Sequence, residues 1–228
     1  MDAIAPVRGS GTERTSYPRW LKAGFWVCVV IAVAVVLRRV VALAHPAQGT
    51  SPIAALDAVF ASHAALTLAH ILPAMAFVLL APFVLSRRYG ALWVKRLFYP
   101  LGAVVGVTAY AMSVYSVGGW VERSAVLFFN SLFLFSLARA YGLMRRGEAV
   151  ETMRWTLRAV GILLGIATTR PVMGVFFATS RLTHLEPGQF FGIAFWIGFS
   201  INTIAVELWL RSQGGRTVFA RVGMPAGS

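Results

Sequence analysis

The chain has 228 residues, of which 58% are hydrophobic and 13% are charged, and its formal net charge is +13. A mean hydropathy of +0.71 excludes an ordinary soluble domain, because a chain of this length cannot bury so much apolar surface. The basic charge does not indicate nucleic-acid binding, because the arginines gather in short segments between apolar runs and no binding fold is recognisable. The composition therefore predicts an integral membrane protein in contact with the lipid bilayer.

Six apolar segments follow a polar arm at residues 1–19. Each segment is long enough to cross a hydrocarbon core of ~30 Å. The predicted helices cover residues 20–44, 62–85, 97–117, 121–143, 152–179 and 189–210. Residues 45–60 are predicted to form a loop, and residues 211–228 a basic cytoplasmic tail. The expected fold is thus all-α, an integral membrane bundle of six transmembrane helices that span residues 20–210.

The positions of Lys and Arg set the expected orientation of the bundle. Most of them lie in the arm, in the second and fourth connections and in the tail, whereas the other connections hold few. Cytoplasmic segments carry such an excess, so both termini are expected to be cytoplasmic, as in a multi-pass protein of the bacterial inner membrane. The first apolar run partly resembles a signal peptide, but Arg38 and Arg39 interrupt it, so we interpret it as an uncleaved helix.

A polar layer is predicted in the outer half of the bundle. Arg170 and Pro171 lie within an otherwise apolar run. An arginine in such a place normally faces a partner or a wet cavity, and the proline frees a carbonyl one turn earlier. At ~1.5 Å per residue, Arg170 lies at a depth similar to that of His70 and Asn130, with His63 at the outer edge. These four residues, His63, His70, Asn130 and Arg170, form the predicted ligand-binding site.

Two interpretations of Arg170 stay open. It can clamp the freed carbonyls or Asn130, or it can contact an anion or a lipid headgroup, because arginine binds carboxylate and phosphate bidentately. Arg38 and Arg39 are expected to extend to the outer headgroups. No carboxylate or cysteine is expected in the outer layer, so no metal site is predicted.

The two helix histidines also raise the question of a cofactor. His63 and His70 share one helix face, and axial histidines inside helix bundles hold b-type haem. No other predicted span contains a histidine, so a single haem b would need a second ligand from a loop histidine or a methionine. The alternatives are hydrogen bonds from these histidines to carbonyl, serine or threonine groups of the bundle, or a proton-relay or substrate role.

Two further features of the sequence bear on whether the protein is a transporter or an enzyme. Pro73 and Pro171 interrupt the second and fifth helices, and matched interrupted helices are typical of transporters. No nucleophile elbow, P-loop, dinucleotide fingerprint or zincin motif is present, so no catalytic residue is predicted. The site is expected to bind a small ligand, a lipid headgroup or a membrane-protein partner. A haem redox protein, a small secondary transporter and an accessory subunit of a membrane complex are the alternatives.

Residues 155–171 carry the motif of a family resemblance that extends over about residues 62–171. Trp155 and Arg158, followed by the sequence ATTRP at 167–171, resemble an uncharacterised family of predicted bacterial multi-pass membrane proteins (domain of unknown function, family 2306). In that family a second arginine follows the first after twelve residues, as Arg170 follows Arg158 here. The family's histidines correspond to Thr152 and Lys95 in this chain. The resemblance implies a membrane architecture and no particular chemistry.

Near the inner end of the sixth predicted helix, Glu207 is expected to pair with an arginine. The candidates are Arg154, Arg158 and Arg211.

Two pairs of glycines, each at four-residue spacing, predict close helix contacts, namely Gly102 with Gly106 and Gly161 with Gly165.

Overall fold

The computed structural model describes residues 17–45, 52–86, 92–183 and 187–222. Within these residues the chain forms helices and no strands. In chain order the helices are α1 (Arg19–Ala44), α2 (Pro52–Ser62), α3 (Ala64–Leu85), α4 (Leu92–Ser113), α5 (Gly119–Arg145), α6 (Ala149–Thr183) and α7 (Pro187–Val222).

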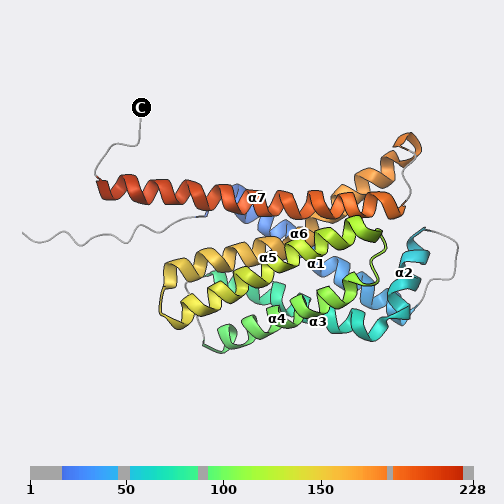
Figure 1. Ribbon diagram of the computed structural model, residues 1–228, viewed down its shortest axis with the longest axis horizontal. Coiled ribbons are helices and arrows are strands. Elements are labelled where there is room, and N and C mark those ends of the chain that lie inside the picture. The colour runs from blue at the N-terminus through green and yellow to red at the C-terminus, as the bar shows by residue number, and fades with distance from the viewer. Residues whose placement is uncertain (1–16, 46–51, 87–91, 184–186, 223–228) are drawn as a thin grey trace, which may run out of the picture.

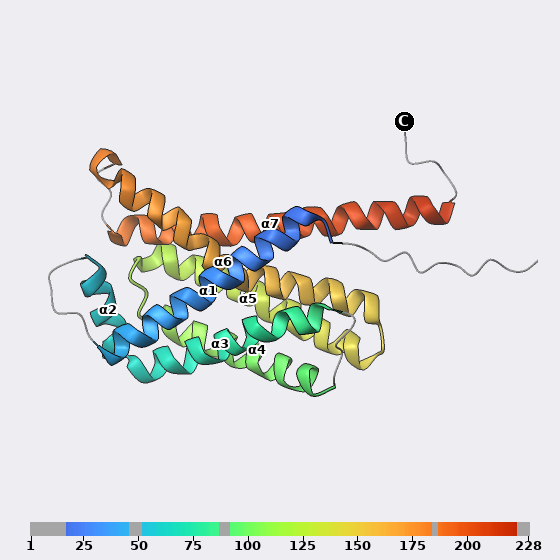
Figure 2. The ribbon, with the colours of Figure 1, turned by 180° about the vertical axis from the view of Figure 1, so that it is seen from behind.

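The long helices form one bundle in which neighbours along the chain pack side by side. The pairs α3–α4, α4–α5, α5–α6 and α6–α7 are all in contact, and α7 also packs on α5 (Figure 1). Figure 2 shows α1 crossing the back of the bundle obliquely, where it contacts α3 and α6. The short α2 lies where α1 ends and α3 begins, and we call this part of the molecule the α2 end.

Within the described residues, five helical segments are long and apolar enough to cross a membrane. They are Arg19–Ala44, Ala64–Leu85, Gly119–Arg145, Ala149–Thr179 and Gly188–Gln213. The described chain is therefore an all-helical bundle that suits a multi-pass membrane protein. The third expected span corresponds to α4, which carries Lys95 and Arg96 near its start and is not among the five. A total of six spans, with α4 among them, and the cytoplasmic position of both termini stay predictions.

The expected boundaries differ most from the structure at two places. The predicted loop at 45–60 is wrong in its second half, because α2 begins at Pro52, whose fixed φ suits the first turn of a helix. The predicted end of the last helix at 210 is also wrong, since α7 continues to Val222. No proline interrupts residues 211–222, so the backbone hydrogen bonds of α7 can continue. Residues 1–16 of the predicted arm and residues 46–51 lie outside the described residues.

Aromatic side chains join the middle helices of the bundle. The ring of Phe77 on α3 stacks on Phe98 of α4, with centroids 4.1 Å apart. Phe133 of α5 meets the same Phe77 ring edge-on at 5.7 Å. All three side chains are buried, so they fix α3, α4 and α5 around a shared core.

The two glycine pairs lie at close helix contacts, as the sequence predicts. A Cβ added at Gly106 would lie 2.4 Å from Leu134 of α5, and one at Gly161 would lie 2.6 Å from Val206 of α7. Gly102 and Gly165 have equally close neighbours on the same two partner helices. Small residues at these positions therefore let the helices approach one another.

Gly198 of α7 closely approaches the backbone of α6. A Cβ at this position would lie 2.6 Å from the backbone nitrogen of Thr169, which cannot move without shifting α6. We expect Gly198→Ala to destabilise the protein by about 1–3 kcal/mol, the usual cost of overpacking.

Thermal unfolding in detergent measures this effect, and Gly174→Ala is the matched control. Gly174 lies within α6 and has no neighbouring atom within 4 Å of an added Cβ. Its replacement removes a poor helix former, so stability should stay the same or rise by up to ~1 kcal/mol. Equal melting temperatures for the two variants would contradict the close contact between α6 and α7.

Candidate functional site

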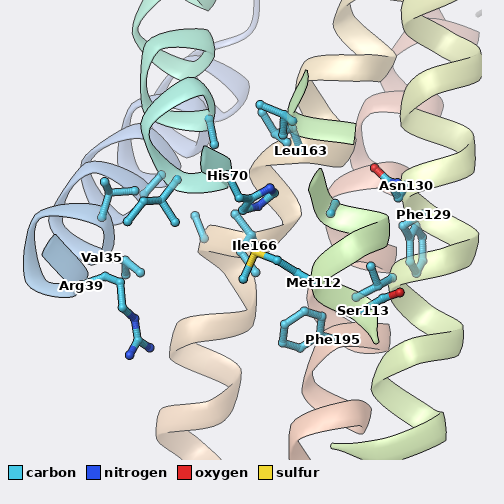
Figure 3. Close-up of a pocket in the computed structure, with 18 of the residues that line it drawn as sticks. Val35, Arg39, His70, Met112, Ser113, Phe129, Asn130, Leu163, Ile166 and Phe195 are labelled. Carbon is cyan, nitrogen blue, oxygen red and sulfur yellow. The ribbon is translucent and has the colours of Figure 1, made fainter. Parts of the chain in front are cut away.

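A cavity of about 230 Å³ lies among the helices towards the α2 end. Side chains from every helix contribute to its lining, and most of them are apolar. His70, Asn130 and Arg170 all line it, so three of the four residues predicted to form a site surround one space. Figure 3 shows His70 of α3 and Asn130 of α5 on opposite sides of the cavity, with Arg39 on the α1 side.

Arg170 of α6 is incompletely bonded. Its Nε atom is buried and has no hydrogen-bond partner among the described residues, and its Nη1 lies 3.9 Å from Met173 Sδ, a weak acceptor. Asn130 Nδ2 donates instead to the backbone oxygen of Gly106 at 2.9 Å. The interpretation of Arg170 as a clamp on Asn130 is therefore wrong, and Asn130 joins α5 to α4.

Glu122 is a carboxylate in the lining of the cavity, where none was expected. Its Oε2 accepts a hydrogen bond of 2.6 Å from the backbone N–H of Gly118, just before α5. Only 8% of the residue is exposed, and it interacts favourably with the charge of Arg170. The expectation was wrong because a carboxylate in the first turn of a helix can fold back onto free amides and become buried.

Arg38 and Arg39 share a carboxylate instead of extending towards headgroups. Arg38 Nη2 lies 2.9 Å from Asp57 Oδ2, and Arg39 Nη1 donates to Asp57 Oδ1. The guanidinium of Arg39 also lies 3.9 Å from the ring centre of Phe60. The side chains of Arg39 and Asp57 are only 12% and 8% exposed, whereas Arg38 is half exposed. The expectation was wrong because α2, which was not predicted, brings Asp57 against α1.

His70 is bonded across the contact between α3 and α4. His70 Nδ1 lies 3.0 Å from Thr108 Oγ1, which in turn lies 2.7 Å from the backbone oxygen of Val104. The ring nitrogen that faces Thr108 is thus used within the bundle. His70 Nε2 is the other polar atom of the ring, so His70 both links α3 to α4 and keeps a second nitrogen for a further contact.

His63 is separated from the other three predicted site residues. It forms the junction between α2 and α3, where its Nδ1 lies 2.9 Å from Ser62 Oγ. Its ring packs on Tyr115, with centroids 3.8 Å apart, and Tyr115 in turn lines the cavity. The structure thus places His63 behind the lining and not in it.

The cavity does not suit a haem. Among the described residues that line it, His70 is the one histidine, so a second ligand there would have to be a methionine, Met75 or Met112, and it is the size of the cavity that argues against a haem. A volume of about 230 Å³ is below the usual range of ~300–1,000 Å³ for drug-sized ligands, and a haem is a large member of that class. Within the described part of the chain, no three His, Cys, Asp or Glu side chains gather as a metal site.

Two further polar clusters lie outside this cavity. Thr168 donates to Asn202 Oδ1 at 2.8 Å, and Cys28 Sγ lies 3.6 Å from the same Thr168 oxygen. This contact fixes α1 to α6 and α7, and the sequence offered no signal for it beyond single polar residues in apolar runs. The predicted pairing of Glu207 is confirmed, because it binds Arg158 Nε at 2.9 Å and Arg211 Nε at 3.2 Å.

Comparisons with protein-family models, with curated proteins and with solved structures found no match for this chain. The resemblance around Arg158 and Arg170 therefore stays a prediction. The functional interpretation rests on the described residues themselves.

Asp57 is expected to be the most sensitive charged residue at the α2 end. Asp57→Asn would leave Arg39 buried without a counter-charge, and breaking such a pair costs on the order of 3 kcal/mol. Thermal unfolding in detergent should show a clear fall in melting temperature.

Glu151→Gln is the control for Asp57→Asn. It breaks a partly exposed pair with Arg154 within one helix, which contributes ~0.5 kcal/mol or less. A similar small shift for both variants would show that the contact between α1 and α2 contributes little to stability.

Proposed function

We propose that this protein is a multi-pass membrane protein that binds a small, largely apolar molecule in the cavity at the α2 end. The observation that carries the proposal is the cavity itself, about 230 Å³ of mostly apolar lining with a few convergent polar groups. This combination is typical of small-molecule sites, where the apolar wall supplies affinity and the polar groups fix orientation. No catalytic role is proposed for any residue.

The polar groups differ in their availability to a ligand. Asn130 uses its amide nitrogen on Gly106, and His70 uses Nδ1 on Thr108. His70 Nε2 and Arg170 Nε have capacity left, so these two groups are the proposed polar contacts of the ligand. His63 is proposed to act only indirectly, by supporting Tyr115 from behind.

A second candidate function is transport of the bound molecule. Pro73 lies inside α3 and Pro171 inside α6, and both helices contribute to the lining of the cavity. Both helices continue past the proline, but a proline removes one backbone hydrogen bond, and helices weakened in this way beside a central site are typical of secondary transporters. This observation favours transport over a purely structural role.

The proposed orientation places both termini in the cytoplasm of a bacterium and the α2 end outside the inner membrane. It is supported by the basic residues of the α5–α6 connection, Arg145 and Arg146, at the opposite end of the bundle. In a Cys28→Ser background, we expect Val114→Cys to react with an impermeant maleimide on intact cells.

The matched variant for this labelling is Glu148→Cys, which lies at the α5–α6 turn. It should react only after the cells are permeabilised. The reverse pattern of labelling would invert the proposed orientation.

Binding to the cavity can be tested with a simple apolar probe. In lipid nanodiscs we expect fluorobenzene to bind saturably, as seen by broadening and shift of its ¹⁹F resonance relative to empty nanodiscs. Ala109 lines the cavity on α4, so Ala109→Phe should fill the space and weaken binding by at least about 10-fold.

Ala103→Phe is the control on the same helix, because Ala103 is exposed and does not line the cavity. It should bind fluorobenzene like the unmodified protein. The absence of saturable binding, or an equal effect of both variants, would refute the proposed function.

A further inference from the structure

We propose that the ligand of the cavity is a carboxylate carried on a small apolar body, with its carboxylate bound by Arg170. This inference rests on the proposed function and names the chemical class of the molecule. It is carried by the charge balance around the cavity, by the unpartnered nitrogen of Arg170 and by the size of the space.

Among the described residues of the lining and their ion-pair partners, the charges do not cancel. The charged side chains in the described lining are Arg39, Arg170 and Glu122. Arg39 shares Asp57 with Arg38 outside the lining, so three guanidinium groups face two carboxylates. One positive charge is left, and Arg170 is also repelled by Arg38 and Arg39. A bound monoanion would neutralise this group of side chains.

Arg170 is the group that such an anion would meet. Its Nε is buried without a partner, although a buried polar atom is normally hydrogen-bonded. Glu122 attracts Arg170 but directs Oε2 to the backbone N–H of Gly118. Arg123 also has an unpartnered Nε, but it does not line the cavity and lies over the ring of Trp120. The free donor and the surplus charge therefore coincide only at Arg170 within the described lining.

The chemistry of arginine favours a carboxylate. Its planar guanidinium donates two parallel hydrogen bonds to the two oxygens of a carboxylate, and Nε is one of the donors available for this geometry. A phosphate monoester carries close to two negative charges near neutral pH, which would exceed the surplus charge of the site. A cation would add to the repulsion.

The remaining space favours a compact apolar body. A cavity of ~150 Å³ accommodates benzene, so a cavity of about 230 Å³ suits a ligand of roughly ten non-hydrogen atoms. Its wall includes the aromatic rings of Phe129, Phe133 and Phe195. Octanoate has this size and a single negative charge, which makes it a suitable probe.

The test compares octanoate with octanol and octyl phosphate by equilibrium dialysis of the protein in nanodiscs, with empty nanodiscs subtracted. Octanol has the same chain without the charge, and octyl phosphate carries a phosphate monoester in place of the carboxylate. We expect octanoate to bind at least about 10-fold more tightly than either, the usual contribution of a charged hydrogen bond.

The variant Arg170→Gln should weaken octanoate about 10-fold or more and leave octanol within about two-fold of its original affinity. Arg170→Lys keeps the positive charge but cannot donate two parallel hydrogen bonds from one planar group. Its affinity for octanoate should therefore lie between those of the unmodified protein and Arg170→Gln. If Arg170→Gln does not fold, Glu122→Gln replaces it, because removal of that carboxylate should tighten octanoate and not octanol.

The outcomes separate this inference from the proposed function. Equal binding of octanoate and octanol, or weaker octanoate binding by Glu122→Gln, would overturn the inference that the ligand is a carboxylate. If fluorobenzene still binds in that case, the proposed function stands. Preferred binding of octyl phosphate would also overturn the inference and assign the site to a phosphate monoester. Failure of fluorobenzene and of all three octyl compounds would overturn both.

Discussion

The cost of keeping arginine inside an apolar bundle governs the α2 end of this protein. Three arginines from α1 and α6 lie close enough to interact electrostatically, and water is largely excluded around two of them. Two carboxylates of the bundle compensate these positive charges. The fold brings Asp57 against Arg38 and Arg39 through a short extra helix, and it buries Glu122 beside Arg170. The cavity lies between these two compensating groups.

This constraint explains why α2 is helical and why it lies across the end of the bundle. Asp57 can reach both arginines only if the chain turns back after α1. Phe60, one turn later, then covers Arg39 with its ring, and Thr67 bonds back to the Phe60 carbonyl. Each contact fixes the junction between α2 and α3, so compensation of charge and closure of the cavity depend on the same few residues.

The sequence predicted much of this arrangement for a physical reason. Membrane helices must satisfy their own backbone, so apolar length locates them, and a rise of ~1.5 Å per residue converts position into depth. That reasoning placed His70, Asn130 and Arg170 in one layer, and all three line one cavity. Helix rotation is not encoded by depth, which is why His63 was included although it packs behind Tyr115.

The missed residues were missed because their environment depends on tertiary contacts. Asp57 and Glu122 lie at the edges of apolar runs, where a carboxylate is normally solvated. Only the packing of α2 on α1, and the turn at Gly118 before α5, bury them. Likewise, Thr108 bonds His70 through a contact between α3 and α4 that no spacing along either helix specifies.

The sparse burial of α1 has a consequence for how the proposed ligand would reach the cavity. Val29 is the one buried residue of this helix, yet Val33 and Val36 form part of the cavity wall. In a bilayer, acyl chains would cover the other side of that wall, which is a single helix thick. α1 separates from the bundle with less loss of buried apolar area than any deeply packed helix. Lateral entry from the hydrocarbon, beside α1, is therefore the route that least disturbs the fold. This route suits a ligand that partitions into lipid before it binds.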